Sequence, residues 1–151
     1  MSEVATPSTQ ELLSRTALAV FRVHGQVLEV AEELAQPVGL TAARWQVLGA
    51  VITEPLPVAG IARVMGLARQ SVQRIADLLV EQGLAEYQPN PAHRRAKLLH
   101  VTEAGLAAMN KISPAHRVMA DRLADALGTP AFAQVTESLE QLVVALETIG
   151  Y

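Results

Sequence analysis

The chain has 151 residues, half of them hydrophobic and 18% charged, with a formal net charge of -3. This composition supports a folded core and excludes wholesale disorder. The chain has no cysteine, which excludes disulfides, thiolate metal sites and thiol chemistry. Its apolar runs are too short to span a membrane and its polar start lacks the pattern of a secretory signal, so we expect a cytoplasmic protein with no membrane partner.

The N-terminal third is predicted to be helical after a frayed tail over residues 1–8. Apolar residues recur every three or four positions between Leu13 and Leu34, which indicates one long helix that ends near Pro37. A second helix is expected from a cap at Thr41 as far as Ile52, where two nearby prolines stop it.

The middle of the chain predicts two short helices, a tight turn and a hairpin. Residues 58–65 and 68–82 carry the helical pattern and are joined by a turn at Gly66, which is the signature of a helix-turn-helix. Residues 84–88 and 98–101 read as strands around a basic, proline-containing loop. A hairpin directly after a helix-turn-helix is a wing.

The C-terminal third is again predicted to be helical. Thr102 is expected to cap a helix that Pro114 kinks or splits and that ends at Gly128. Thr129 is expected to cap the last helix, with Pro130 at its first position.

Charge is divided unevenly along the chain. Residues 58–97 hold six cations and three anions and are therefore net +3, whereas the remainder is net -6. A basic middle on an acidic scaffold is typical of a DNA-reading lobe, although an ordinary solvated face has the same composition.

Five segments of the chain together resemble the MarR family of winged-helix transcriptional regulators. They are residues 40–48 (LTAARWQVL), 68–79 (ARQSVQRIADLL), 83–84 (GL), 89–96 (PNPAHRRA) and 101–105 (VTEAG). The resemblance follows the element order of the whole chain. A lone helix-turn-helix is a weak signal, whereas this joined series with its wing is a specific one.

The resemblance implies a mainly α fold with a small β-hairpin wing. Residues 37–105 would form the winged helix-turn-helix DNA-binding domain, and residues 1–36 and 106–151 a helical region that makes a homodimer. It also implies a repressor of nearby genes that binds a pseudo-palindromic operator in double-stranded DNA and is released by a small aromatic or anionic effector. No cofactor is expected.

The wing departs from the family pattern at three positions. The family often has Asp where Asn90 and His93 stand, and Arg where Tyr87 stands. In the family the wing Asp pairs with an Arg and braces the loop. With His93 in its place we expect this brace to be absent, so that the wing is more mobile or is held by other contacts.

Long polar side chains at the start of the second short helix are suited to reading base edges in the major groove, because each base pair presents a distinct donor and acceptor pattern there. We expect base contacts from Arg69, Gln70 and Gln73, with Gln able to bridge adenine, and phosphate contacts from Ser71 and Arg74. The alternative is a plain amphipathic surface helix.

The basic loop of the wing supplies three further candidate DNA contacts, Arg94, Arg95 and Lys97. We expect one of the two arginines to enter a narrow minor groove, where negative potential is focused, and the other to meet a phosphate or fold back. A solvated turn charge is the alternative.

The last helix carries more apolar surface than one lobe needs. We call the following residues the α-helical seam: Val135, Leu139, Leu142, Val143 and Leu146. They suit a partner helix, or else packing within one chain.

An effector pocket is the least specific expectation. His24, Arg44 and Trp45 could line it, with a cation meeting an anionic ligand; the alternative is a half-buried histidine, a surface cation and a core tryptophan. The four histidines lack the spacing of a zinc site, so we expect no metal.

Other functions remain open at this stage. An enzyme is not expected, because the sequence has no phosphate loop, no nucleophile elbow and no paired carboxylates; Glu32 and Glu33 are adjacent on a helix and point apart. A protein-interaction module that has lost specific DNA binding, and a regulator that senses no effector, are the remaining alternatives.

Overall fold

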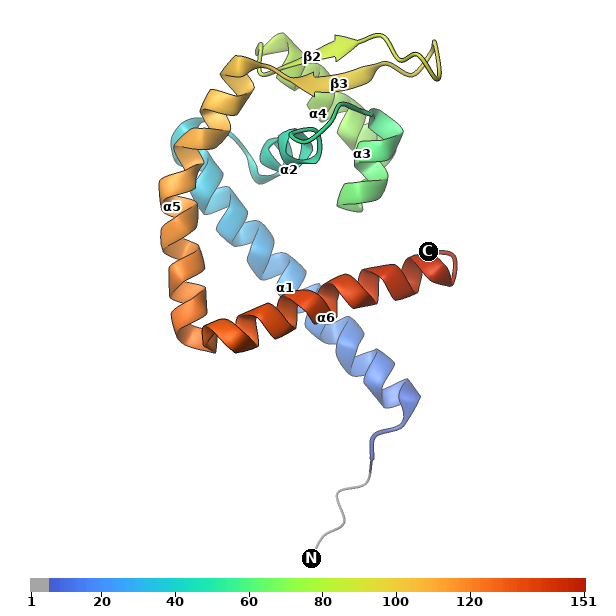
Figure 1. Cartoon of the computed structure of the whole chain (residues 1–151), viewed down its shortest axis with the longest axis vertical. Coiled ribbons are helices and arrows are strands. Elements are labelled where there is room, and N and C mark those ends of the chain that lie inside the picture. The colour runs from blue at the N-terminus through green and yellow to red at the C-terminus, as the bar shows by residue number, and fades with distance from the viewer. Residues whose placement is uncertain (1–5) are drawn as a thin grey trace, which may run out of the picture. The chain divides into compact units, whose positions relative to one another are not determined.

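The computed structural model describes residues 6–151, so most of the expected tail, residues 1–5, lies outside the described part of the chain. The elements are α1 (Thr9–Ala35), the short 3-10 turn η1 (Gln36–Val38), α2 (Ala42–Ala50), β1 (Leu56–Pro57), α3 (Val58–Met65), α4 (Arg69–Glu81), β2 (Ala85–Gln88), β3 (Leu98–Val101), α5 (Glu103–Leu127) and α6 (Thr129–Thr148) (Figure 1). The predicted fold class, mainly helical with a small β-hairpin, is confirmed. The chain divides into two compact units, and the boundary along the chain lies between Lys111 and Ile112.

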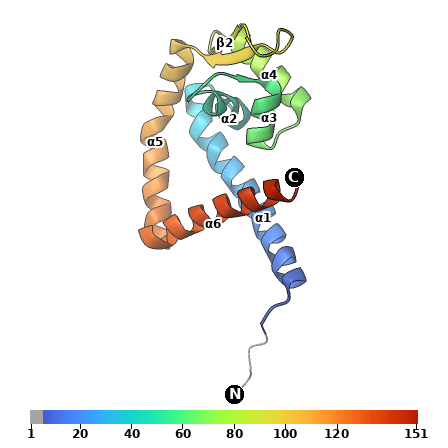
Figure 2. The same ribbon diagram turned by 45° about the vertical axis from the view of Figure 1, so that its right-hand side comes forward.

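The core of the first unit lies between α2, α3, α4 and the small sheet, which Figures 1 and 2 show gathered together. Its fully buried side chains include Val47, Leu48, Ile61, Val72, Leu79 and Leu99. Every one of these elements contributes an apolar stripe, and removing those stripes from water is the main force that joins the elements. Val72 therefore fixes which face of α4 points outward.

The sheet is antiparallel with the order β1-β3-β2. Tyr87 lies opposite Leu99 and Glu86 opposite His100. The two-residue strand β1 was not predicted, because its prolines indicated only the end of a helix. Pro57 cannot donate a backbone hydrogen bond, which confines it to an edge position such as this one.

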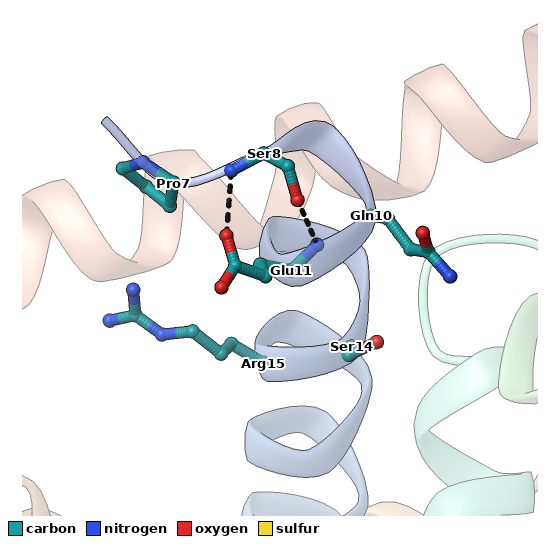
Figure 3. Close-up of a pocket in the computed structure, with 6 residues that line it drawn as sticks. All are labelled: Pro7, Ser8, Gln10, Glu11, Ser14 and Arg15. Atoms are coloured by element: carbon teal, nitrogen blue, oxygen red, sulfur yellow. Dashed lines mark hydrogen bonds between the residues drawn. The ribbon is translucent and has the colours of Figure 1, made fainter. Parts of the chain in front are cut away.

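The first helix begins at a capping box, which the sequence did not lead us to expect. The Ser8 hydroxyl accepts from the Glu11 backbone N at 3.2 Å, and the Glu11 carboxylate accepts from the Ser8 backbone N at 2.8 Å. Figure 3 shows both bonds and the shallow hollow beside them, which is lined only by residues near the first turns of α1. Reciprocal bonds of this kind satisfy two backbone groups that a helix start leaves unpaired.

Helix α1 is tied to α2 through a carboxylate. The backbone N of Ala42 donates to Glu32 Oε2 at 2.7 Å, and the backbone N of Arg44 donates to Thr41 Oγ1 at 3.2 Å. The expected cap at Thr41 is confirmed, and Glu32 adds a second acceptor from another helix. Helix α2 is shorter than predicted and ends at Ala50 rather than at Ile52.

The junction between the wing and α5 is tightly packed. Thr102 Oγ1 accepts from the Gly105 backbone N at 3.1 Å, which confirms the predicted cap, and also donates to the Gly83 carbonyl at 2.6 Å. The Thr102 backbone N donates to the Leu84 carbonyl at 3.1 Å. The start of α5 is therefore bonded to the turn that follows α4.

We expect Gly105→Ala to lower the free energy of unfolding by about 3 kcal/mol, the upper part of the range for overpacking. A methyl group at this position would collide with the Leu84 carbonyl and lie 2.8 Å from a methyl group of Val101. Urea unfolding would measure the loss. Gly49→Ala is the matched control, because its added methyl group would meet nothing within 4 Å apart from the chain neighbours and the backbone of its own helix, and alanine favours the helix. Equal stabilities of the two variants would contradict the prediction.

Three predictions about the last helices are corrected. Helix α5 runs through Pro114 without a break, so Pro114 does not split the helix, which was one of its two predicted effects; the other, a kink, stays a prediction. The residue that caps α6 is Gly128, with φ of 82° and no side-chain bond, rather than Thr129, which is already helical. Pro130 is therefore the second helical residue rather than the predicted first, and it still lies in the first turn, where its missing N–H leaves no intrahelical hydrogen bond unmade.

The apolar side chains of the terminal helices are largely exposed. In the α-helical seam, Val135, Leu139, Val143 and Leu146 are 41–55% exposed and Leu142 is half-buried. In α1, Leu13, Leu18 and Phe21 are about 70% exposed. Within residues 6–151, no helix combines the length and apolarity needed to cross a bilayer. Packing within the chain thus leaves these faces uncovered.

Candidate nucleic-acid interface

The turn between α3 and α4 sets the direction of α4. Helix α3 ends at Met65 and is capped by Gly66, which has a left-handed φ of 63°. The Leu67 backbone N donates to the Ala62 carbonyl at 3.0 Å. A glycine adopts this conformation without the steric cost that a side chain would add. The chain then reverses within three residues and enters α4 at Arg69.

The outward face of α4 carries the predicted base-reading side chains. Arg69, Gln70, Gln73 and Arg74 are exposed, whereas Ser71 is half-buried. Val72 is fully buried, as the helical pattern required. The long polar groups therefore share the face opposite the core.

The wing loop is shaped by bonds within itself. The Ala92 backbone N donates to Asn90 Oδ1 at 3.0 Å, and the Ala96 backbone N donates to the His93 carbonyl at 3.1 Å. Arg94, Arg95 and Lys97 are exposed on this loop. The loop extends beyond the paired strands in both views (Figures 1 and 2).

A basic hollow of about 360 Å³ lies between the wing and α4. We define it by its lining residues, which are Pro57, Val58, Ala59, Arg69, Gln73, Tyr87, Arg95, Ala96 and Lys97. Three cations and no carboxylate line it, so it favours a polyanion. Arg94 is not among the lining residues, so the two neighbouring arginines differ in that Arg95 faces the hollow and Arg94 does not.

Tyr87, Asp77 and Gln73 form a hydrogen-bonded triangle between α4 and β2. The Tyr87 hydroxyl donates to Asp77 Oδ1 at 2.6 Å, and Gln73 Nε2 donates to the same oxygen and to the Tyr87 hydroxyl, each at 3.0 Å. The base of the wing is thus held by contacts other than the Asp–Arg pair of the family, which is the second of the two alternatives that the sequence left open. In the sequence, Tyr87 stands out only as a departure from the family pattern and Asp77 carries no signal, because no local spacing reveals a contact between a helix and a later strand.

The triangle changes the acidity of the phenol. Partial burial, the hydrogen bond to Asp77 and the negative charge of Asp77 raise the pKa of Tyr87 to about 12 from its ordinary 10.0, and the bond from Gln73 offsets part of the rise. Because the folded state holds the proton more tightly, the stabilising contribution of this hydroxyl is fully present below pH 10.0 and is lost as the pH rises through about 12.

The raised pKa of Tyr87 can be measured directly. Since the chain has two tyrosines, Tyr151→Phe leaves Tyr87 as the remaining phenol. We expect its phenolate absorbance, read by stopped flow immediately after a pH jump, to titrate with a midpoint near 12. Adding Asp77→Asn should move the midpoint toward 10.0, since it removes the charge that disfavours the phenolate. A midpoint near 10.0 with Asp77 intact would contradict the triangle.

The structure does not gather the suggested effector residues into the basic hollow. His24 is exposed on α1 rather than half-buried, and Arg44 and Trp45 are half-buried on α2, so the tryptophan is not a core residue. Among the described residues, no group of three potential ligands could hold a metal ion. His100 instead faces Glu86 across the strand pair, with Nδ1 3.8 Å from Oε1.

Comparison with known proteins identifies the family. The sequence model of the MarR family matches residues 38–96, which span α2 to the wing loop. The uncharacterised protein Rv2011c of Mycobacterium tuberculosis is 39% identical over 135 residues, covering 89% of this chain and 94% of that protein. The chain belongs to the MarR family. The transcriptional regulator PetP of Rhodobacter capsulatus is 31% identical over 88 residues, covering 58% of this chain and 53% of PetP.

Solved structures share the winged-helix fold of this MarR-family chain. CouR of Rhodococcus jostii, in complex with p-coumaroyl-CoA, has a TM-score of 0.73 at 24% identity, covering 89% of this chain and 95% of CouR. A mutant of Escherichia coli MarR, in complex with operator DNA, has a TM-score of 0.73 at 20% identity, covering 90% of this chain and 99% of MarR. At these identities the likeness establishes the fold of this DNA-binding regulator.

Proposed function

We propose that this chain is a homodimeric repressor that binds a pseudo-palindromic operator in double-stranded DNA. The basic hollow carries this proposal, because it places cations of the wing beside the polar face of α4. Phosphate contacts supply most of the affinity of such proteins, and base-edge contacts supply the specificity. Residues 37–105 would read DNA, and residues 1–36 with 106–151 would form the dimer.

Roles for the individual side chains follow from their positions. Arg69 and Gln70 lie on the first turn of α4 and would contact base edges, with Gln73 one turn later. Ser71 and Arg74 would contact phosphates. On the wing, Arg94 lies outside the basic hollow and would enter the minor groove, whereas Arg95 and Lys97 line the hollow and would meet the backbone.

A second copy of the chain would cover the exposed apolar faces of the terminal helices. Burying a leucine or valine side chain contributes about 1.5–3 kcal/mol, so a seam of this size favours association strongly. Two DNA half-sites that lie about one turn of the duplex apart, ~34 Å, also require two DNA-binding domains. The dimer therefore serves both stability and recognition.

Release by a small aromatic or anionic effector completes the proposal. The ligand-bound structure of CouR supports it by analogy at the level of the fold. His24, Arg44 and Trp45 remain the suggested contacts. An effector would act by favouring dimer arrangements whose α4 helices no longer match the half-site spacing, and it can do so only through a difference in its affinity for those arrangements.

Fluorescence anisotropy tests DNA binding. The protein would be titrated onto the intergenic duplex beside its own gene and onto a scrambled duplex, at about 50 and 200 mM salt. We expect tight binding to the native duplex that weakens steeply with salt. Equal and weak binding to both duplexes would contradict the proposal and favour the protein-interaction module instead.

A further inference from the structure

Two hydrogen bonds join the end of α1 to the start of α2. The Leu40 backbone N donates to the Ala35 carbonyl at 3.1 Å, and the Ala42 backbone N donates to Glu32 Oε2 at 2.7 Å. Ala35, Leu40 and Ala42 are buried, so both bonds lie beside an apolar contact. We call residues 32–42 the α1–α2 joint.

The carboxylate of Glu32 supplies an acceptor that α2 lacks. The first N–H groups of a helix have no acceptor within the helix, and negative charge is favourable at that end. Thr41 Oγ1 accepts from one of these groups, the Arg44 backbone N, and Glu32 accepts from another, that of Ala42. Because Ala42 is buried, turning α1 away from α2 would leave its N–H without this acceptor. Glu32 therefore favours one angle between the two helices.

Helix α1 is a long arm attached at this joint. It packs chiefly against α2 and η1, and Ala35, its last residue, is the buried one. Figures 1 and 2 show α1 extending away from α2. Its 27 residues make a helix about 40 Å long. A turn of about 5° at the joint therefore moves the far end by about 3.5 Å, close to the ~3.4 Å rise of one base pair.

We infer that Glu32 is a positioning residue, which fixes the angle between the proposed dimerisation helix α1 and the DNA-binding domain and thereby the spacing of half-sites that the dimer accepts. This inference rests on the proposed function and refines it. An operator of another spacing requires the two DNA-binding domains to shift, and in the wild type that shift costs the bond from Ala42 to Glu32. Without the bond the same shift costs less, so the spacing preference is relaxed.

Loss of this bond should loosen the DNA-binding domain without detaching or unfolding it. The start of α5 is the second connection between the two proposed regions, and its bonds to Gly83 and Leu84 do not involve the joint. Glu32 is itself exposed and adds nothing to the apolar core. Variants at this position are therefore expected to fold.

Anisotropy on a series of duplexes tests the inference. The full-length wild type first selects its operator from a random duplex library, and one base pair is then inserted or deleted at the centre of the selected site. The wild type should bind the selected spacing at least about tenfold more tightly than its neighbours, and Glu32→Ala should bind all three within about threefold, since a hydrogen bond to a charged group contributes about tenfold or more. A merely structural role would weaken binding to every duplex equally and leave the ratio unchanged.

Three further variants separate reach from charge. Glu32→Asp keeps a carboxylate on a side chain one methylene shorter, so it should lose the preference and provides the test if Glu32→Ala does not fold. Glu32→Gln keeps an acceptor oxygen at the original length and should restore most of the preference. Glu33→Ala is the matched control, because it removes a neighbouring exposed carboxylate whose side chain makes no hydrogen bond within residues 6–151. It should behave as the wild type.

The outcomes separate this inference from the function on which it rests. If Glu32→Ala or Glu32→Asp unfolds cooperatively, sediments as the wild type does and keeps the wild-type ratio, Glu32 does not set the spacing and the DNA-binding function stands. A wild type that binds all spacings equally would lead to the same conclusion. A library from which no sequence is enriched would overturn both.

Discussion

A chain that carries Leu139→Glu together with Val143→Glu is expected to be monomeric and to bind its operator about a hundredfold more weakly or worse. Both side chains lie in the α-helical seam and are 44% and 55% exposed within the chain. Carboxylates at these positions would have to be buried, or paired with like charges, on the proposed dimer face. Linking two DNA-binding domains raises the affinity for an operator with two half-sites by about 10²–10⁴-fold, and a monomer loses this gain.

Sedimentation equilibrium would measure the association and anisotropy the binding. Ala133→Glu with Gln141→Glu is the matched control, because it adds the same charge to exposed positions on the opposite face of α6. The control should remain dimeric and should keep its affinity. A seam variant that still sediments as a dimer would show that another surface, such as the exposed face of α1, makes the contact.

Replacement of both wing arginines, Arg94→Ala with Arg95→Ala, should weaken operator binding by roughly tenfold or more for each arginine. Hydrogen bonds to charged groups contribute about 1.5–3 kcal/mol, which sets this scale. The slope of log affinity against log salt should also fall by about 0.9 for each phosphate contact that is lost. The single variants should differ, because Arg95 lines the basic hollow and Arg94 does not.

Arg117→Ala with Arg122→Ala is the control for the wing, since it removes two exposed cations from α5 and changes the net charge equally. Its salt slope should match that of the wild type. If the wing variant retained both its affinity and its slope, the wing would not contact DNA, and α4 would have to supply the whole interface.

Much of the proposed DNA-contact surface could be predicted because its signals are local. The apolar spacing around Val72 fixed the outward face of α4, and Gly66 marked the turn before it. The basic loop between the two predicted strands, residues 84–88 and 98–101, predicted the wing. Each of these inferences uses neighbours within about one helical turn or one hairpin, where side-chain direction follows from backbone geometry.

Contacts between distant elements could not be predicted in the same way. Tyr87 reaches Asp77 because β2 pairs with β3 in one register and packs on α4, and the sequence alone specifies neither the register nor the packing. The link from Glu32 to Ala42 likewise depends on how α1 meets α2. Both Gly128 and Thr129 are residue types that can cap a helix. The structure has Gly128 as the cap of α6, because the backbone there has a positive φ, which glycine adopts more readily than threonine.

Helix α5 leaves little freedom to alter the length of the chain. It is capped by Thr102, which is bonded to the turn after α4, and it continues without a loop past Lys111 and Ile112, where the first unit ends and the second begins. One inserted residue would rotate everything beyond it by about 100° and advance it by about 1.5 Å. Insertions and deletions in this segment should therefore be purged during evolution even where single substitutions are tolerated, and chimaeras between relatives should be joined in phase along α5.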